Sequence, residues 1–212
     1  MKTQTELALR QTPSGETRAT LRQLQTATEQ TTRLVNQLLS LARAEPGTDR
    51  PVAAAPVLLS QLAREATTEW VPSALAREID LGFDSAGDDQ RIEGDAFLLR
   101  EMLNNLLDNA IRYTHRGGQV TVTVRAESGD VMLRVEDNGP GIPEAERERV
   151  FERFYRVLGT GVDGCGLGLA IVKEIAHQHG AKVTLAIGAG GRGTIVTLRF
   201  PSGTGTPVAT SS

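Results

Sequence analysis

The chain has 212 residues, a formal net charge of −3, one cysteine and three histidines. One cysteine can form neither an internal disulfide nor a cysteine-rich zinc site, which suits a reducing compartment. The mild negative charge gives no electrostatic case for nucleic acid as a partner. No stretch approaches the roughly 18 apolar residues that a membrane-spanning helix needs, so we expect no direct membrane contact.

The first 45 residues predict a helical hairpin. Residues 16–44 contain neither glycine nor proline, and their small and apolar side chains recur every three or four positions. Residues 1–12 are typical of the end of a preceding helix, and a proline–glycine turn at 13–15 separates the two. A solvent-exposed charged helix is the alternative. Residues 46–56, rich in proline and interrupted by glycine, predict a linker.

Residues 57–200 combine helical and strand patterns and predict one α+β domain. The helical patterns cover residues 57–75, 95–113 and 164–179, and the strand patterns cover 79–83, 119–126, 131–136, 182–187 and 194–200. Helices and antiparallel strands within one domain predict a two-layer α/β sandwich. The polar, low-complexity residues 201–212 predict a disordered tail.

The predicted helix over residues 95–113 carries the first group of candidate functional residues. Asn105 and Asn109 are four positions apart and share one face of the helix. An asparagine carbonyl oxygen suits a hard cation such as Mg²⁺. Arg112 could reach phosphate oxygens, and Tyr113 could stack on a flat ring. A polar, solvated helix face is the alternative interpretation.

Two glycine clusters form the other candidate groups. Asp137, Gly139 and Gly141 follow a strand directly, where the glycines allow a sharp turn and close approach of a ligand. Five glycines between positions 159 and 168 precede a helix, whose free N–H groups suit an anion. Residues 159–164 match a dinucleotide-binding pattern, but no strand precedes them and no βαβ unit surrounds them. Ordinary turns are the alternative for both clusters.

Together these groups resemble the catalytic ATP-binding domain of sensor histidine kinases. That domain shares its fold with gyrase, mismatch-repair and heat-shock chaperone ATPases. The matching segments are residues 101–113 (N box), 137–141 (first glycine box), 151–156 (F box), 164–169 (second glycine box) and 193–194 (a weaker last box). The resemblance covers roughly residues 52–200. It implies a Bergerat-type fold, with a mixed, mostly antiparallel sheet and helices on one face.

The resemblance also implies a role for each residue in a Mg·ATP site. Asp137 would accept a hydrogen bond from the adenine amino group. Asn109 would coordinate Mg²⁺, and Asn105 would line the metal and phosphate side. Arg112 would contact phosphates and, with Asn105, is predicted to be catalytic, while Tyr113 would pack against adenine. The other residues expected to bind nucleotide are Gly139, Gly141, Ile142, Gly164, Gly166, Leu167, Gly168 and Thr194.

One position separates two classes of enzyme. The related ATPases carry a glutamate four residues before the metal-binding asparagine, where it activates water. Asn105 occupies that position here, and an amide cannot act as a general base. This favours a kinase, with Arg153 or Arg156 near the γ-phosphate. An ATP-hydrolysing member of the superfamily and a serine-kinase or anti-sigma-type ATP-binding regulator are the alternatives.

The resembling kinases phosphorylate a histidine on the first hairpin helix and then an aspartate of a response regulator, and the hairpin forms a homodimer. Residues 1–45 contain no histidine. His115, His177 and His179 are predicted to be ordinary surface or helix-end residues. The resemblance implies that this chain is a soluble cytoplasmic portion of a bacterial inner-membrane sensor. Because the hairpin has no histidine, we expect this portion to bind nucleotide but not to phosphorylate itself.

Overall fold

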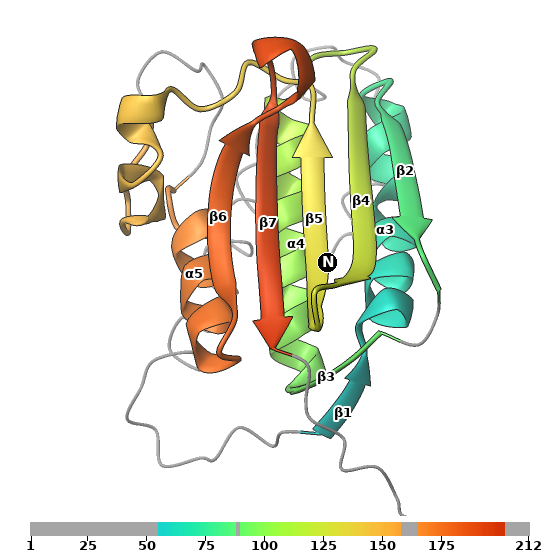
Figure 1. Ribbon diagram of the computed structural model, residues 1–212. Helices are drawn as coiled ribbons and strands as arrows, with labels where there is room; N and C mark the ends of the chain where they lie inside the picture. The colour runs from blue at the N-terminus through green and yellow to red at the C-terminus, as the bar shows by residue number, and fades with distance from the viewer. Residues whose placement is uncertain (1–54, 88–89, 158–164, 202–212) are drawn as a thin grey trace, which may run out of the picture. The chain divides into compact units, whose positions relative to one another are not determined.

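The computed structural model describes residues 55–87, 90–157 and 165–201 (Figure 1). All of them belong to the second of the two units into which the chain divides, Arg43–Ser212. The described elements, in chain order, are β1 (Ala55–Leu58), α3 (Leu59–Ala76), β2 (Asp80–Ser85), β3 (Arg91–Gly94), α4 (Ala96–Tyr113), β4 (Gln119–Glu127), β5 (Asp130–Asp137), η1 (Glu144–Glu146), η2 (Arg149–Phe151), α5 (Gly168–Gln178), β6 (Lys182–Ile187), η3 (Ala189–Gly191) and β7 (Thr194–Pro201). The predicted hairpin and nearly all of the predicted tail lie outside the described residues.

Five strands form one sheet in the order β2-β4-β5-β7-β6, and β1 pairs with β3 in a separate two-stranded sheet (Figure 1). β2 runs parallel to β4, and the other neighbouring pairs are antiparallel. β4 and β5 join through Ser128 and Gly129, whose φ angles are 54° and 86°. Two successive positive φ angles match the right-handed twist of a tight hairpin. The sheet is therefore mixed and mostly antiparallel, as predicted.

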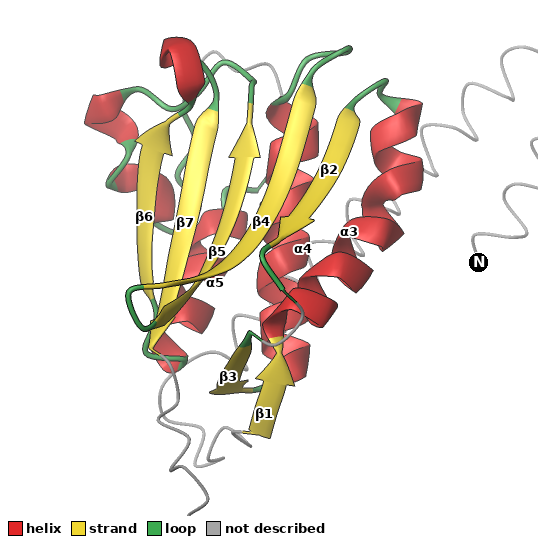
Figure 2. Cartoon of the chain, turned by 45° about the vertical axis from the view of Figure 1, so that its right-hand side comes forward, coloured by secondary structure: helices red, strands yellow, loops and turns green. Residues whose placement is uncertain are grey.

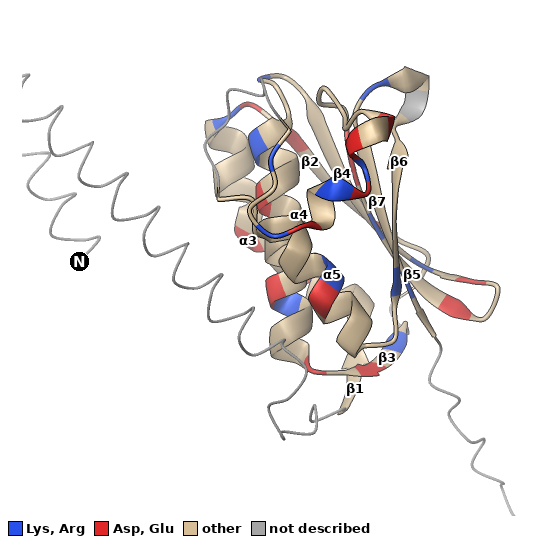
Figure 3. Ribbon diagram, turned by 90° about the vertical axis from the view of Figure 1, so that its left-hand side faces the viewer, with Lys and Arg blue, Asp and Glu red and all other residues tan. Residues whose placement is uncertain are grey.

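The helices lie together on one face of the five-stranded sheet (Figures 2 and 3). On β4, Val120, Val122 and Val124 are fully buried, whereas Thr121 and Thr123 between them are half-buried. Successive strand residues point to opposite faces, so only the valine row of β4 faces the helices. This arrangement confirms the two-layer α/β sandwich that the sequence predicted.

α4 is the helix that carries the predicted N box. Asp95 caps its first turn, because the carboxylate accepts hydrogen bonds from the backbone N–H groups of Phe97 (2.8 Å) and Leu98 (3.2 Å). The buried face of α4 is apolar apart from Asn105. Neither α4 nor another helix within the described ranges has the length and apolar character that crossing a membrane needs.

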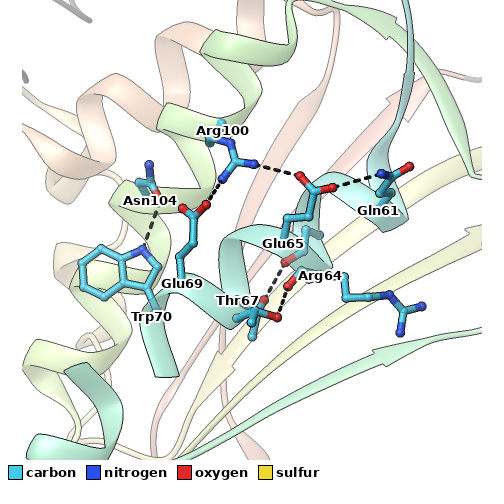
Figure 4. Close-up of polar contacts among 10 residues, drawn as sticks. Gln61, Arg64, Glu65, Thr67, Glu69, Trp70, Arg100 and Asn104 are labelled. Carbon is cyan, nitrogen blue, oxygen red and sulfur yellow. Dashed lines mark hydrogen bonds and ion pairs between the residues drawn. The ribbon is translucent and has the colours of Figure 1, made fainter. Parts of the chain in front are cut away.

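Polar contacts at the surface join α3 to α4 (Figure 4). The Arg100 guanidinium pairs with the carboxylates of Glu65 (2.9 Å) and Glu69 (2.8 Å), and the Trp70 indole N–H donates to Asn104 Oδ1 at 3.0 Å. The ion pairs are largely exposed, so each contributes about 0.2–1 kcal/mol. The main consequence of these contacts is that the Asn104 side chain is turned toward α3.

Two helix boundaries differ from the sequence prediction. Residues 57–75 were predicted to be wholly helical, but Ala55–Leu58 is a strand because its backbone pairs with β3. That strand begins inside the segment predicted as a linker. Residues 164–179 were also predicted to be helical, but α5 begins at Gly168. Gly166 has φ 72°, a left-handed conformation that a right-handed helix cannot include.

Candidate functional site

The carboxyl end of β5 carries a buried carboxylate. Asp137 is only 8% exposed, and its Oδ1 accepts hydrogen bonds from the backbone N–H groups of Gly139 (2.9 Å) and Thr194 (3.2 Å). Burial raises the pKa of this carboxyl, although these backbone donors and the Thr194 side chain act in the opposite direction. A desolvated carboxylate held in this way is a strong acceptor for a donor on a ligand.

Glycines allow three chain segments to meet around Asp137. A Cβ on Gly139 would lie 2.9 Å from both Asp137 Oδ1 and the Tyr113 carbonyl oxygen. A Cβ on Gly193 would lie 1.8 Å from the Asp137 carbonyl oxygen. Gly141 has φ 78°, and a Cβ there would lie 2.8 Å from the Gly193 carbonyl oxygen. The end of α4, the first glycine box and the segment before β7 therefore contact one another directly.

Asn105 and Asn109 lie against the amino end of α5. A Cβ on Gly168, the first residue of α5, would lie 3.1 Å from Asn109 Nδ2 and 3.5 Å from Asn105 Oδ1. The Asn105 amide donates to the Glu101 carbonyl oxygen at 2.8 Å, which fixes its orientation. The N-cap residue of α5, Leu167, makes no side-chain hydrogen bond to the first turn. Amide oxygens suited to a cation thus lie beside N–H groups suited to an anion.

Arg112 is held at the end of α4 by two contacts. Its Nε lies 3.7 Å from Asp108 Oδ1, one turn earlier, and its carbonyl oxygen accepts a hydrogen bond from the Arg77 guanidinium at 3.1 Å. The guanidinium therefore lies beside a carboxylate, and the predicted phosphate contact stays a prediction. Ile142 follows the first glycine box, where its carbonyl oxygen accepts a hydrogen bond from Arg147 Nε at 3.3 Å.

The F box and the second glycine box are joined through their backbones. The Phe154 N–H donates to the Gly166 carbonyl oxygen at 2.9 Å, and a Cβ on Gly166 would lie 2.6 Å from the Tyr155 carbonyl oxygen. The Tyr155 hydroxyl donates to the Glu146 carboxylate, which raises the pKa of Tyr155, and the Arg149 guanidinium lies 4.2 Å from the ring centroid. Acidic and basic side chains are interleaved between Glu144 and Arg156.

Three predicted residues in the described ranges do not place their side chains in the site, and a fourth predicted residue is not described. Gly164 lies outside the described residues, and Arg153 and Arg156 are exposed. The Leu167 side chain is fully buried, so it belongs to the core and leaves only backbone atoms for a ligand. The roles predicted for the two arginines stay predictions.

The prediction that His179 is an ordinary helix-end or surface residue is correct for its place at the end of α5 but wrong for its environment. His179 is buried, its Nδ1 lies 2.7 Å from the Ile175 carbonyl oxygen, and its Nε2 accepts the Asp95 backbone N–H at 3.0 Å. A Cβ on Gly94 would lie 2.5 Å from this imidazole. His179 thus ties the end of α5 to the start of α4. No local sequence pattern indicates such a contact.

Among the residues that the structure describes, no three His, Cys, Asp or Glu side chains gather to hold a metal ion. The oxygen donors that lie beside Gly168 are the amide oxygens of Asn109 and Asn105, at 3.3 and 3.5 Å from the position of a Cβ there. Amide oxygens are ligands that suit a hard cation such as Mg²⁺.

Comparison with known proteins identifies the family. The profile of the histidine kinase-, DNA gyrase B- and HSP90-like ATPases matches residues 94–204, more than half of the chain. The chain therefore belongs to this family. The N box, both glycine boxes and Asp137 all lie within the matched region.

The relatives are sensor histidine kinases. The sensor protein kinase PmrB of Pseudomonas aeruginosa is 35% identical over 203 residues, which are 95% of this chain and 42% of PmrB. The catalytic domain of histidine kinase ThkA has a TM-score of 0.63 at 28% identity and covers 70% of this chain and 95% of that domain. Full-length ShkA in complex with AMPPNP has a TM-score of 0.74 at 29% identity, over 93% of this chain and 41% of ShkA. The chain corresponds to the ATP-binding catalytic part of such kinases and spans less than half the length of PmrB.

Proposed function

We propose that the chain is the Mg·ATP-binding catalytic portion of a two-component sensor kinase. The longer protein would transfer the γ-phosphate of ATP to a histidine and then to an aspartate of a response regulator. The observation that carries the proposal is the buried Asp137 carboxylate, held where the end of α4, the first glycine box and the start of β7 meet. Such an acceptor selects a base with an exocyclic amino donor, as adenine has. The AMPPNP bound to ShkA supports an ATP-type ligand.

Mg²⁺ enters the proposal as the cation that accompanies ATP. Asn109 would hold it, with Asn105 lining the same side, because both amides adjoin the space that a Cβ on Gly168 would fill. Bound there, the cation would neutralise phosphate charge. The uncapped N–H groups at the start of α5 would face phosphate oxygens, and we assign Arg112 to the same end of the ligand.

Asn105 supports a kinase over an ATP-hydrolysing enzyme. Its amide donates to the Glu101 carbonyl oxygen and has no basic atom that could take a proton from water. Without a base at this position, ATP would persist until a better nucleophile arrives, which is what a histidine kinase requires.

The partners and the location of the longer protein belong to the same proposal. It would be a bacterial inner-membrane sensor that dimerises through the hairpin predicted at residues 1–45, with this portion in the cytoplasm. The relationship to PmrB over 95% of the chain supports this assignment. A response regulator would be its protein partner. The net charge of −3 gives no electrostatic attraction for nucleic acid.

Calorimetric titration with ADP, with and without Mg²⁺, tests the nucleotide site. The wild-type chain should bind ADP more tightly with Mg²⁺, and Asn109→Ala should lose most of that gain. Asn104→Ala is the matched control, because this neighbouring amide is turned toward Trp70 on α3 (Figure 4). The control should bind like the wild type. A wild-type chain that binds no ADP would overturn the proposal.

A transfer assay tests the reaction. The chain would be mixed with labelled ATP, Mg²⁺ and a separately prepared dimeric hairpin that carries a histidine, since residues 1–45 contain none. The expected product is label on that histidine, stable in alkali and labile in acid. Steady release of phosphate without the hairpin would instead support the ATP-hydrolysing alternative.

A further inference from the structure

The sheet register places Ile187 in the same row as Asp137. Asp137 on β5 is opposite Thr194 on β7, and Thr194 is opposite Ile187 on β6. Residues directly opposite each other point to the same face, and their Cα atoms are about 4.5–5.5 Å apart. Ile187 therefore lies two strands from the buried carboxylate, at about 10 Å, on the face that the helices cover.

Ile187 is exposed where its neighbours are not. Val196, Leu198 and Phe200, which face the helices from β7, are at most 7% exposed, but Ile187 is 47% exposed. The other large apolar residues with comparable exposure in the described ranges lie on helices or in a loop: Val71, Leu75, Phe97 and Phe154. In Figure 1 the carboxyl end of β6, where Ile187 lies, extends beyond α5. Among the described residues, Ile187 is thus a half-exposed apolar side chain on the helix-facing side of the sheet.

The chemistry of adenine accounts for an uncovered apolar residue at this place. On the edge of adenine, the amino group at C6 is followed by N1 and then by the hydrogen at C2. With the amino group at Asp137 and N1 near Thr194, the row directs C2 toward β6. Ile187 would present methyl groups to a C–H group there, and its exposed surface would be covered by the base.

We propose that Ile187 is a specificity-determining residue that forms the apolar wall of the base site at C2; this inference rests on the proposed function. Guanine carries an amino donor at C2, which would lose its water against the hydrocarbon of Ile187 and find no acceptor. Ile187 would therefore disfavour guanine at C2, whereas Asp137 disfavours it at C6, where guanine has no amino group. It also lets the site accept a small apolar substituent at C2.

The affinities of the wild type and of three substituted chains for three nucleotides test this apolar wall. ADP, 2-methylthio-ADP and GDP would be titrated with Mg²⁺ into the wild type, Ile187→Ser and Ile187→Val. Ile187→Ser should lower the affinity for ADP by about threefold to tenfold and the affinity for 2-methylthio-ADP by more. It should also reduce the ratio of the ADP affinity to the GDP affinity. Ile187→Val should retain most of the wild-type preference. Phe97→Ser is the matched control, because Phe97 is 50% exposed and lies at the opposite end of α4 from Tyr113.

The outcomes separate this inference from the proposed function. If the wild type binds ADP and Asp137→Asn weakens that binding, but Ile187→Ser leaves the affinities for all three nucleotides unchanged, the inference is wrong and the function stands. An equal loss for ADP and 2-methylthio-ADP with an unchanged GDP ratio also overturns it, because a general disturbance of the fold would act in that way. If the wild type binds no ADP, the proposed function itself fails.

Discussion

Replacing Asp137 with asparagine separates the cost of burying this carboxylate from its use as an acceptor. Oδ1 accepts hydrogen bonds from the backbone N–H groups of Gly139 and Thr194 at 2.9 and 3.2 Å, and an asparagine carbonyl oxygen can keep both. The other carboxylate oxygen becomes an NH₂ group. In the proposed complex this group would face the amino group of adenine, so that two donors oppose each other.

The expected loss of affinity follows from the lost bond. A hydrogen bond to a charged acceptor contributes about 1.5–3 kcal/mol, so Asp137→Asn should raise the dissociation constant for ADP about 10- to 150-fold. Calorimetry with Mg²⁺ present measures this change directly. An affinity within about twofold of the wild type would refute the assignment of Asp137 as the adenine acceptor.

The same substitution should stabilise the folded state at neutral pH. Burial raises the pKa of Asp137 above its ordinary value of 3.8, so the folded state binds the proton more tightly than the unfolded chain. The wild type therefore loses stability as the pH rises through the raised pKa, whereas asparagine cannot ionise. The advantage of the variant in unfolding free energy should increase above pH 3.8 and become constant above the raised pKa.

Urea unfolding at a series of pH values measures this advantage, with the fluorescence of Trp70, the one tryptophan of the chain, as the signal. Trp70 lies on α3 and so reports on the domain that contains Asp137. An advantage that does not change with pH would show that the buried charge carries no cost, and would refute the reasoning.

Two further predictions concern one contact beside Asp137, tested with a control substitution, and one contact that ties α5 to the start of α4. Gly193→Ala would place a methyl group 1.8 Å from the Asp137 carbonyl oxygen and should lower the unfolding free energy by roughly 3 kcal/mol. Gly190→Ala is the control, because Gly190 has φ 72° but no atom within 4 Å of the added Cβ, and it should lower the unfolding free energy by about 1–2 kcal/mol. Urea unfolding compares them, and equal losses would contradict the steric argument. His179→Ala would leave the Asp95 N–H without its acceptor and should lower the unfolding free energy by about 1–3 kcal/mol, with faster hydrogen exchange at that amide. Unchanged stability and exchange would show that this contact is unimportant.

The sequence by itself determined the features that depend on residues close together in the chain. Alternation along β4 and β5 predicts both strands, and Ser128-Gly129 predicts the tight turn between them, because strand faces and turn angles are local properties. The spacing of Asn105 and Asn109 likewise places both amides on one face of α4. The chemical types in the boxes were sufficient to predict a nucleotide site.

Only the tertiary structure decided which groups contact each other across the fold. Asn109 adjoins Gly168, and His179 accepts the Asp95 N–H, across separations of 59 and 84 residues that no local pattern encodes. Nothing in the local pattern of β6 distinguishes Ile187 from a buried strand residue, and its exposure depends on how far the carboxyl end of β6 extends past the amino end of α5. The physical reason is that side-chain type and spacing determine which face of a helix or strand is apolar, whereas packing of whole elements determines what that face meets.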